Sequence, residues 1–544
     1  MAMHSVPLIA FLILAALVLY KFIIYPAFIS PLSKIPAPHP ICHVSPAWIL
    51  WKRLTEWEIR SIHAAHERLG PVIRIGPSEL SVNSVKGGLQ TIYAGGFDKH
   101  EWYPRAFRNY GLPNMFSTIA NKPHSVRKRI ISNIYSKSFL ASSPSLKTIT
   151  QHLLHDNFIP RLSTYARCAT PVDIYAIFSG IAMDLVSSYM CGTDAATDFS
   201  NDLQERTRIL EVFNSRPSYL FYTQELPFLT SFLRRIGIRL VPRRIDAANA
   251  EIETWAMQIF DAARLSMLSS PTDTSKGSQR ESTSYPTVYA QLAAALTKDP
   301  EKATIDPLTP PSTHHLAIAS ECYDHLAAGF DTSGITLTYL VHELSQRPAL
   351  QKALRNELLT LSPPLTAAAA AADAPVLPDY KALDALPLLH AIMQETLRRH
   401  PAIPGPQPRV TPPGTSLGPP GHEFHDIPAG VRVSCQAYSL HRNDAVFPDP
   451  EAWKPERWLN EKGEVVSAED GEQAREMGRW FWAFGSGGRM CVGSNLAIYQ
   501  MKYIVAAIYS SFETSIVDDA GIEQLDRYTA GPTGGKLIIR LKAV

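Results

Sequence analysis

The sequence is poor in cysteine and carries no excess of charge of either sign. Its six cysteines are scattered over 544 residues, without the close pairs that hold a structural zinc ion. Disulfide-rich scaffolds are small and dense in cysteine, so this composition favours a reducing compartment. With 52 basic and 50 acidic side chains, the chain has no global positive field to attract nucleic acid. The composition therefore argues against a zinc finger, a disulfide scaffold and a nucleic-acid-binding protein.

Internal repeats and a dinucleotide-binding fingerprint are also missing. No GxGxxG pattern follows a predicted strand, so the sequence shows no signature for binding a flavin or a nicotinamide nucleotide. Apolar residues at 45% and charged residues at 19% are nevertheless typical of a globular protein. The 43 prolines predict many ordered connections between its elements.

A long apolar run lies near the N-terminus. Residues 6–25 are interrupted only by Pro7 and Lys21, and a helix of about 20 residues spans about 30 Å, the thickness of a bilayer core. Because Lys21 and Lys34 lie toward its C-terminal side, the positive-inside tendency places the rest of the chain in the cytoplasm. The alternative is a cleaved secretory signal, which has a basic start, a shorter apolar run and a small-residue cleavage site. We predict a membrane anchor at residues 1–28.

The rest of the chain is predicted to form a hinge and one domain. The prolines in residues 29–45 favour a stiff, extended connector. Residues 46–544 then form the catalytic domain.

Helical periodicity dominates this domain. It is clearest at residues 316–344 and 382–399, whereas residues 70–84 alternate around a Gly-Pro turn like two short strands. Residues 266–284 are polar and predict an exposed loop, and residues 361–379 predict a second loop, in which prolines bracket an alanine run. We therefore expect a mainly α fold with small β-sheets.

One cysteine lies in a glycine-rich loop at the mouth of a predicted helix. Cys491 belongs to the segment FGSGGRMCVG, residues 484–493. Free amides and the positive end of the helix dipole favour its thiolate, which is the form that binds iron. Arg489 has the geometry to pair with a haem propionate. Residues without a Cβ let such a loop approach a flat macrocycle closely, and the glycines of this loop are Gly485, Gly487, Gly488 and Gly493.

The pattern FxxGxRxCxG in this loop resembles the haem-binding loop of the cytochrome P450 family. A match of this kind is expected by chance in about 1 of 10,000 chains of this length. A lone cysteine is usually a buried packing residue, which is the alternative here. The resemblance implies haem b, with Cys491 as the thiolate ligand of its iron. The other positions that match, and that would contact the cofactor, are Phe484, Gly487, Arg489 and Gly493.

Two residues with the spacing of a helical ion pair lie upstream of this loop. Glu395 and Arg398 share one face of a predicted helix, but the same spacing recurs elsewhere in the chain, where a solvated helix face explains it. Their position about a hundred residues before the cysteine distinguishes them, and the segment PERW supplies Arg457. By resemblance, these three residues form the family's structural triad that holds the haem-side loop.

The segment AGFDTS, residues 328–333, resembles the family's oxygen-activation pattern. Asp331 is costly to bury in so apolar a helix without a partner, which favours a proton-transfer role. Thr332 has an alternative, a hydrogen bond back to the carbonyl of Ala328. The resemblance implies that Asp331 and Thr332 are catalytic and relay protons.

Further cations resemble propionate contacts. His124 opens a basic segment, in which the family usually places a cation four residues later. That residue is Lys128, and Arg127 and Arg129 lie beside it, so the choice among them stays open. Arg409 resembles another propionate contact. The alternative for each is an ordinary surface charge.

The resemblance covers the chain from about residue 46 to its end, with two departures. Ala483 stands where proline often precedes the motif, and Gln500 where glutamate often follows it. The implied substrate pocket is mostly apolar or aromatic, which favours a lipophilic, rigid small molecule. Its predicted lining consists of residues 102–116, 213–228, Leu326, Ala327, Phe330, 402–404 and 529–532.

The implied function is a fungal secondary-metabolite monooxygenase that inserts one oxygen atom from O2 into a lipophilic small molecule. Electrons come from NADPH through a separate flavoprotein reductase, with a small cytochrome as a further donor. The protein lies in the endoplasmic reticulum membrane and contacts lipid through residues 6–25. Two rivals are a reductase-independent haem-thiolate isomerase or dehydratase, and a non-catalytic haem sensor or carrier. A predicted basic docking patch consists of Arg127, Lys128, Arg129, Lys137 and Lys502.

Overall fold

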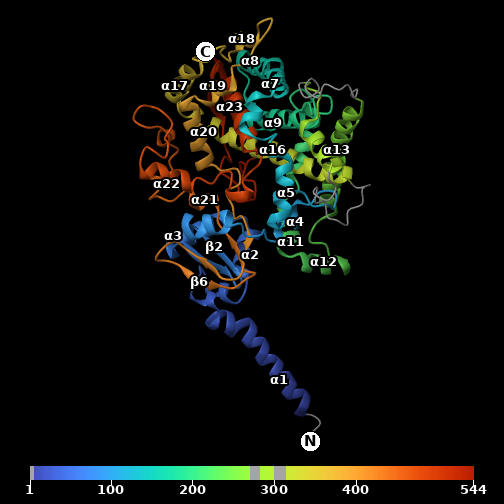
Figure 1. Ribbon diagram of the computed structural model, residues 1–544, viewed down its shortest axis with the longest axis vertical. Coiled ribbons are helices and arrows are strands. Elements are labelled where there is room, and N and C mark those ends of the chain that lie inside the picture. The colour runs from blue at the N-terminus through green and yellow to red at the C-terminus, as the bar shows by residue number, and fades with distance from the viewer. Residues whose placement is uncertain (1–4, 270–281, 299–313) are drawn as a thin grey trace.

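The protein has a large helical part, a smaller part rich in β-strands, and one helix that projects away from both (Figure 1). The computed structural model describes residues 5–269, 282–298 and 314–544. The projecting helix is α1 (Ser5–Leu19), which continues as the π-helix η1 (Tyr20–Ile29). Residues 9–29 are long and apolar enough to cross a membrane, and none of this stretch is buried.

The largest sheet lies close to the end from which α1 projects. Its order is β1 (Val72–Gly76), β2 (Glu79–Val82), β7 (Arg432–Ser434) and β4 (Arg409–Val410). The first two strands confirm the two short strands predicted in residues 70–84, and they pair as an antiparallel hairpin. The parallel pairing of β2 with β7 brings together segments about 350 residues apart in the sequence, and local patterns do not reveal such a pairing.

Two smaller sheets complete the β-structure of the described residues. An antiparallel sheet joins β3 (Val172–Asp173), β9 (Ile538–Ala543) and β8 (Phe512–Asp518). A two-stranded ribbon joins β5 (Thr415–Leu417) and β6 (Phe424–Ile427). The expected mainly α fold with small sheets is therefore confirmed.

A long helix, α16 (His314–Ser345), forms the centre of the helical part and confirms the prediction for residues 316–344. It packs against α9 (Ile174–Cys191), which is almost entirely buried. That burial explains why α9 is apolar enough to resemble a membrane span although it belongs to the core. Further helices are α4 (Trp102–Phe107), α5 (Asn121–Ile131), α10 (Leu203–Asn214), α11 (Leu220–Glu225), α12 (Pro227–Arg235), α13 (Arg243–Ser269), α20 (Pro387–Arg399) and α23 (Ser494–Tyr509).

The remaining helices cover the outside of the molecule. They include α2 (Ala47–Leu54), α3 (Glu58–Leu69), α6 (Lys137–Ser142), α7 (Pro144–Gln151), α8 (Ile159–Arg167), α15 (Thr287–Lys298), α17 (Pro348–Leu358), α18 (Ala367–Ala370), α19 (Tyr380–Asp384), α21 (Ala437–Leu440) and α22 (Glu472–Trp480).

Three local predictions differ from the structure. The single helix expected over residues 382–399 is divided, because Pro387 begins a new helix, α20, after α19 has ended. Residues 29–45 are not extended throughout: they form two 3-10 turns, and Ile35 packs against the large sheet. Residues 266–269 belong to α13 rather than to a loop, and residues 270–281 of that predicted loop lie outside the described residues.

Candidate functional site

The cysteine loop is closed by its own backbone. The amide of Cys491 donates to the carbonyl oxygen of Phe484 over 2.9 Å, three residues before α23 begins. Gly487 has φ +67°, and a Cβ there would lie 2.6 Å from the carbonyl oxygen of Tyr93, so packing requires glycine. A Cβ at Gly493 would meet no described protein atom within 4 Å. Packing within the chain therefore does not explain Gly493, whereas close approach of a flat cofactor does.

Cys491 is accessible, but the surrounding protein limits the hydration of its sulfur. Burial raises the pKa of the thiol above its usual value, and the amides of Gly493 and Ser494 and the charge of Lys128 oppose this rise. The amides at the helix mouth thus act in the predicted direction without outweighing desolvation. The thiolate needs a further cation close to the sulfur, and a bound iron ion meets that requirement.

Lys128 holds the loop from α5. Its ammonium donates to the carbonyl oxygens of Gly488 and Met490 over 3.1 and 2.8 Å. Arg127 points elsewhere: it donates to a backbone carbonyl over 2.9 Å and lies 3.6 Å from the Glu321 carboxylate. Of the three candidate cations Arg127, Lys128 and Arg129, the structure therefore places Lys128 against the cysteine loop, and Arg129 is exposed.

Three cations gather beside this loop. Lys99 and Arg409 are buried and face each other in a β-bridge. Burial lowers the pKa of Lys99, and the nearby charges of Arg409 and Arg489 lower it further. The Lys99 ammonium donates to the Phe116 carbonyl over 2.5 Å and lies over the Phe116 and Tyr103 rings. Within the described residues, none of the three cations has a carboxylate oxygen within 4.0 Å.

The neighbouring contacts leave part of this charge without a counter-ion. Arg489 donates to the Asn121 side chain over 2.9 Å and to two backbone carbonyls before α5. Arg409 donates to the Tyr103 hydroxyl over 2.9 Å, but its buried Nε has no partner among the described residues. Burial, followed by the nearby cations, lowers the pKa of His124 to about 3, so this ring is neutral at pH 7. Buried cations without counter-ions are costly, and the two propionates of a haem fit this requirement.

The predicted oxygen-activation segment lies on α16. The Thr332 hydroxyl donates to the Ala328 carbonyl over 2.9 Å. This is the local hydrogen bond that the sequence offered as the alternative to a catalytic role. Asp331 is buried, and burial raises the pKa of its carboxyl to about 6, although a hydrogen bond with Thr529 opposes the rise. Asp331 is therefore a carboxyl that changes its protonation close to neutral pH.

A stripe of α16 remains accessible while the helix around it is buried. Between Ile318 and Val341, the residues that are not buried are Asp324, Ala327, Ala328, Gly329 and Thr332. Their spacing of three and four residues places them on neighbouring parts of one face. The predicted pocket residues Leu326 and Phe330 are instead buried in the helical core.

Gln500 connects the helix that follows the cysteine with α16. Its side-chain amide donates to the Gly329 carbonyl over 3.3 Å and to the Ser333 hydroxyl over 2.5 Å. The departure from glutamate at this position therefore supplies a donor that ties α23 to the AGFDTS segment.

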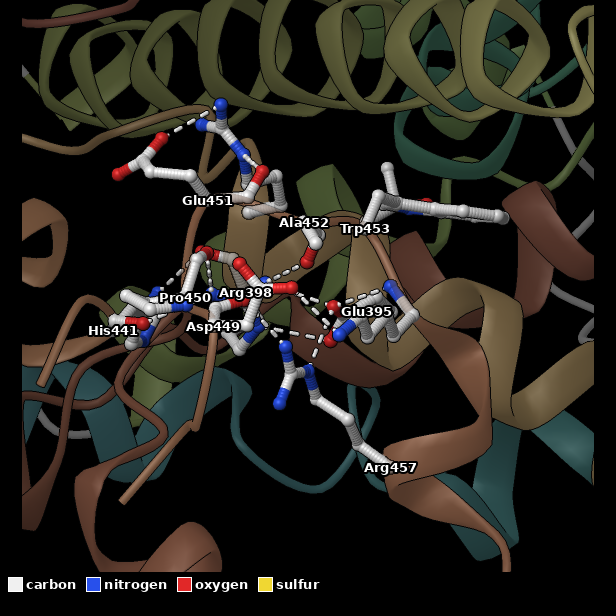
Figure 2. Close-up of polar contacts among 12 residues, drawn as sticks. Glu395, Arg398, His441, Asp449, Pro450, Glu451, Ala452, Trp453 and Arg457 are labelled. Atoms are coloured by element: carbon white, nitrogen blue, oxygen red, sulfur yellow. Dashed lines mark hydrogen bonds and ion pairs between the residues drawn. The ribbon is translucent and has the colours of Figure 1, made fainter. Parts of the chain in front are cut away.

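Figure 2 shows that the side chains of the predicted triad meet. Arg398 binds both oxygens of Glu395 over 2.9 and 2.8 Å, and both side chains are fully buried. Arg457 donates to the same carboxylate over 3.3 Å, and Trp458 donates to it over 3.0 Å. With the amide of Lys454 also donating over 2.8 Å, this carboxylate is fully paired, as a buried charge requires.

The triad reaches the cysteine loop through a histidine that the sequence did not single out. Arg398 donates to the His441 carbonyl over 2.9 Å, and Nδ1 of His441 lies 2.9 Å from the Arg398 carbonyl. The Trp482 amide donates to the other ring nitrogen over 2.7 Å. Since burial lowers the pKa of His441 to about 3, the ring is neutral and can accept this bond while Nδ1 donates. The residues just before the cysteine loop are thereby fixed to α20.

The predicted basic docking patch is wrong at Lys502. This lysine is fully buried in α23 and pairs with Asp384 over 2.7 Å. The helix is apolar on both sides of Lys502, so its face is covered by protein and the charge needs an internal partner. Among the other positions, Arg129 and Lys137 are exposed.

Comparison with known proteins agrees with this geometry. The family model described as Cytochrome P450 matches residues 90–536. Similar proteins include the cytochrome P450 monooxygenase avaI of Aspergillus versicolor, 28% identical over 81% of this chain and 94% of that protein. The cytochrome P450 monooxygenase BOT1 of Botryotinia fuckeliana is 26% identical over 93% of this chain and 89% of that protein. The fusicoccadiene C-8 hydroxylase of Alternaria brassicicola is 24% identical over 96% of this chain and 92% of that protein.

The chain belongs to the cytochrome P450 family. Its relatives are fungal monooxygenases, so it is an oxidoreductase of the monooxygenase class. Membership implies haem with cysteine thiolate ligation, a small-molecule substrate, O2 and a redox partner.

Sequence reasoning missed Lys99 as well as His441. Lys99 lies in the segment FDKHEWY, where a single lysine has the appearance of a surface charge. Its burial depends on the β-bridge with Arg409, more than 300 residues away. The only local signal was the aromatic content around it.

Proposed function

We propose that this protein is a haem-thiolate monooxygenase that inserts one oxygen atom from O2 into a lipophilic small molecule, as a tailoring step of fungal secondary metabolism. The observation that carries the proposal is the combination of an accessible cysteine at a helix mouth with buried cations that lack carboxylate partners. Cys491 would hold the iron, and Arg409, Arg489 and Lys99 would pair with the propionates. Phe484 and Gly493 would lie against the cofactor, whereas Gly487 packs against the backbone of Tyr93.

The residues of the chain have distinct tasks around this cofactor. Bound haem with a thiolate ligand supplies the activation of O2, because the thiolate donates electron density that favours O–O cleavage. Lys128 fixes the carbonyls on either side of Arg489 and so positions Cys491. Asp331 holds or releases a proton at its carboxyl oxygen, and the Thr332 hydroxyl passes that proton toward the accessible stripe of α16.

The test of this function is consumption of NADPH by the purified protein with a flavoprotein reductase and lipophilic candidate substrates. Consumption matched by oxygenated product supports a monooxygenase. Turnover of a peroxide substrate without reductase would favour the isomerase or dehydratase. Haem binding without any turnover would favour the sensor or carrier. The AGFDTS segment supports the first outcome, since a carrier does not need a proton relay.

Replacing Lys99 by leucine is expected to release haem roughly tenfold faster than in the wild type, because a charge-assisted bond to a propionate is lost. Leucine keeps the apolar volume between the Phe116 and Tyr103 rings. The measurement is the rate of haem transfer to apomyoglobin. Lys122→Leu, at an exposed position in the first turn of α5, is the control and should leave the rate unchanged. An unchanged rate in the Lys99 variant would remove Lys99 from the propionate site.

Electrons are proposed to come from NADPH through a separate flavoprotein reductase, with a small cytochrome as a further donor. The chain has no dinucleotide fingerprint of its own. Arg129 is an exposed cation on α5 and suits an acidic partner better than the buried Lys502. Lys137, at the start of α6, is also exposed, but it pairs with Asp384 over 2.5 Å.

The proposed location is the endoplasmic reticulum membrane, with residues 1–28 as anchor, residues 29–45 as hinge and residues 46–544 as the cytoplasmic domain. A second apolar surface supports this orientation. On α12, Phe228 is 85% exposed, and Leu229 and Phe232 are also exposed. Figure 1 shows α12 toward the same end of the molecule as α1, so both can meet one bilayer.

Deleting residues 1–25 is expected to move most of the protein from the membrane pellet to the soluble fraction, with its haem spectrum retained. This boundary keeps Pro26, whose carbonyl accepts a 2.8 Å bond from buried Arg74. Introducing Phe228→Glu and Phe232→Glu into the shortened chain should remove the remaining membrane association. If the shortened chain stayed in the pellet even with both substitutions, the anchor would have to lie elsewhere.

A further inference from the structure

The accessible stripe of α16 contains a carboxylate without a partner. Asp324 is partly accessible, four residues before Ala328 and eight before Thr332. No hydrogen bond or ion pair within 4.0 Å involves its side chain among the described residues. The other acids of this helix segment have closer partners: Glu321 accepts from the Met115 amide over 2.9 Å and lies 3.6 Å from the Arg127 guanidinium, and Asp331 bonds with Thr529.

The charge of Asp324 is poorly compensated by the protein. Burial raises the pKa of its carboxyl to about 7, with Glu321 acting in the same direction and His325 and Lys99 opposing the rise. Neither His325 nor Lys99 lies within ion-pair distance of Asp324. A propionate paired with Lys99 would weaken the compensation further. A carboxyl in this situation gains most from a cationic partner supplied by a ligand.

Aromatic rings form a wall in the same region. The Tyr528 ring lies 5.1 Å from Phe107, and Phe107 lies 4.9 Å from Phe116. All three are partly accessible. Burial raises the pKa of the Tyr528 hydroxyl, and the nearby charge of Asp324 raises it further. The amide of Met115, the residue before Phe116, donates to Glu321 over 2.9 Å, three residues before Asp324 on α16. The wall and the carboxylate therefore border one space.

This wall already binds an ammonium group. Nζ of Lys99 lies 3.8 Å from the centre of the Phe116 ring and 4.1 Å from that of Tyr103. Aromatic faces attract cations through the ring quadrupole, and the attraction is stronger when the cation is desolvated. A carboxylate beside an aromatic wall is the chemistry that recognises an amine.

We propose, on the basis of the monooxygenase function above, that Asp324 is a specificity-determining residue that binds the protonated amine of an otherwise lipophilic substrate. The apolar body of that substrate lies against Phe107, Phe116 and Tyr528. The substrate class is thereby narrowed from lipophilic small molecules to lipophilic amines.

The test is a spectral binding titration of the full-length holoprotein with a matched pair of probes. The probes are N-methyldicyclohexylamine and its carbon isostere, in which C–H replaces the nitrogen. The wild type is expected to bind the amine roughly tenfold more tightly, as a charge-assisted hydrogen bond predicts. The quaternary dimethyldicyclohexylammonium ion, which cannot ligate iron, should also bind more tightly than the isostere. Equal affinity of the wild type for amine and isostere would overturn the proposal.

Two variants assign the preference to the carboxylate. Asp324→Asn should lose the roughly tenfold preference while its affinity for the isostere stays unchanged. Asp324→Glu, which keeps the charge, should retain a preference for the amine. Asp373→Asn removes an exposed carboxylate and should behave as the wild type. If Asp324→Asn kept the full preference, another group would bind the amine, and the proposal would be wrong.

The failure of this inference is distinguishable from failure of the proposed function. The carbon monoxide difference spectrum of each preparation reports the haem-thiolate centre independently of any amine. A wild type without that spectrum contradicts the haem-thiolate function itself. A wild type with that spectrum but without amine preference contradicts only the role of Asp324.

Discussion

Replacing Glu395 by alanine is expected to lower the free energy of unfolding by about 3–5 kcal/mol. The substitution leaves Arg398 fully buried without its carboxylate, and Arg457 and Trp458 lose the same acceptor. An uncompensated buried charge costs more than the pair itself contributes. The measurement is urea denaturation of wild type and variant under identical conditions.

The chain offers a matched control for this substitution. Glu472 and Arg475 have the same spacing on α22 (Glu472–Trp480), but their side chains are 68% and 44% exposed. Glu472→Ala should cost no more than about 1 kcal/mol, because exposed pairs are screened by water. Equal losses in the two variants would show that burial does not give the triad its importance.

The position of the triad predicts a second effect. Arg398 is bonded to His441, which accepts from the Trp482 amide just before the cysteine loop. Glu395→Ala should therefore release haem faster than Glu472→Ala at the same temperature. Retention of haem at the wild-type rate would confine the role of the triad to the loop of residues 441–458.

Replacing Asp331 by asparagine is expected to slow product formation by a factor of about 100 to 10,000, the range typical of a lost acid or base. Asparagine keeps the shape but cannot release a proton. Thr332→Ala should instead divert reducing equivalents into hydrogen peroxide at the expense of product. The measurement is the amount of product and of peroxide formed for each NADPH consumed.

Thr336 supplies the control on the same helix. Its hydroxyl donates to the Thr332 carbonyl over 2.9 Å, the same local bond that Thr332 makes, but Thr336 is buried and lies off the accessible stripe. Thr336→Ala should keep wild-type coupling of NADPH consumption to product. Unchanged coupling in Thr332→Ala would reduce Thr332 to helix packing.

The elements with strong local signals were predictable from the sequence. Three elements depend mainly on residues that are neighbours in the sequence. They are the long helical periodicity of α16, the hairpin of β1 and β2, and the glycine loop before α23. The ion pair of Glu395 and Arg398 also follows from helical spacing. Its burial does not, since the exposed pair Glu472–Arg475 has the same sequence pattern.

The features that were missed depend on contacts between distant segments. Lys99 is buried because it faces Arg409 across a β-bridge, and Lys502 because Asp384 offers it an internal partner. The residues next to a charged side chain in the sequence do not reveal a distant partner, so sequence analysis places the charge on the surface. The break before α20 was missed for a different reason. Pro387 is a local signal for a helix start, but the helical periodicity continues on both sides of it, so the sequence predicted one helix.

The central claim is that Cys491 is the thiolate ligand of a haem iron, and the carbon monoxide difference spectrum of the dithionite-reduced protein tests it most directly. The wild type should show the strongly red-shifted Soret band of a thiolate-ligated haem, and Cys491→Ala should lack it. A wild type that bound no haem, or a Cys491→Ala variant that kept the red-shifted band, would contradict the account.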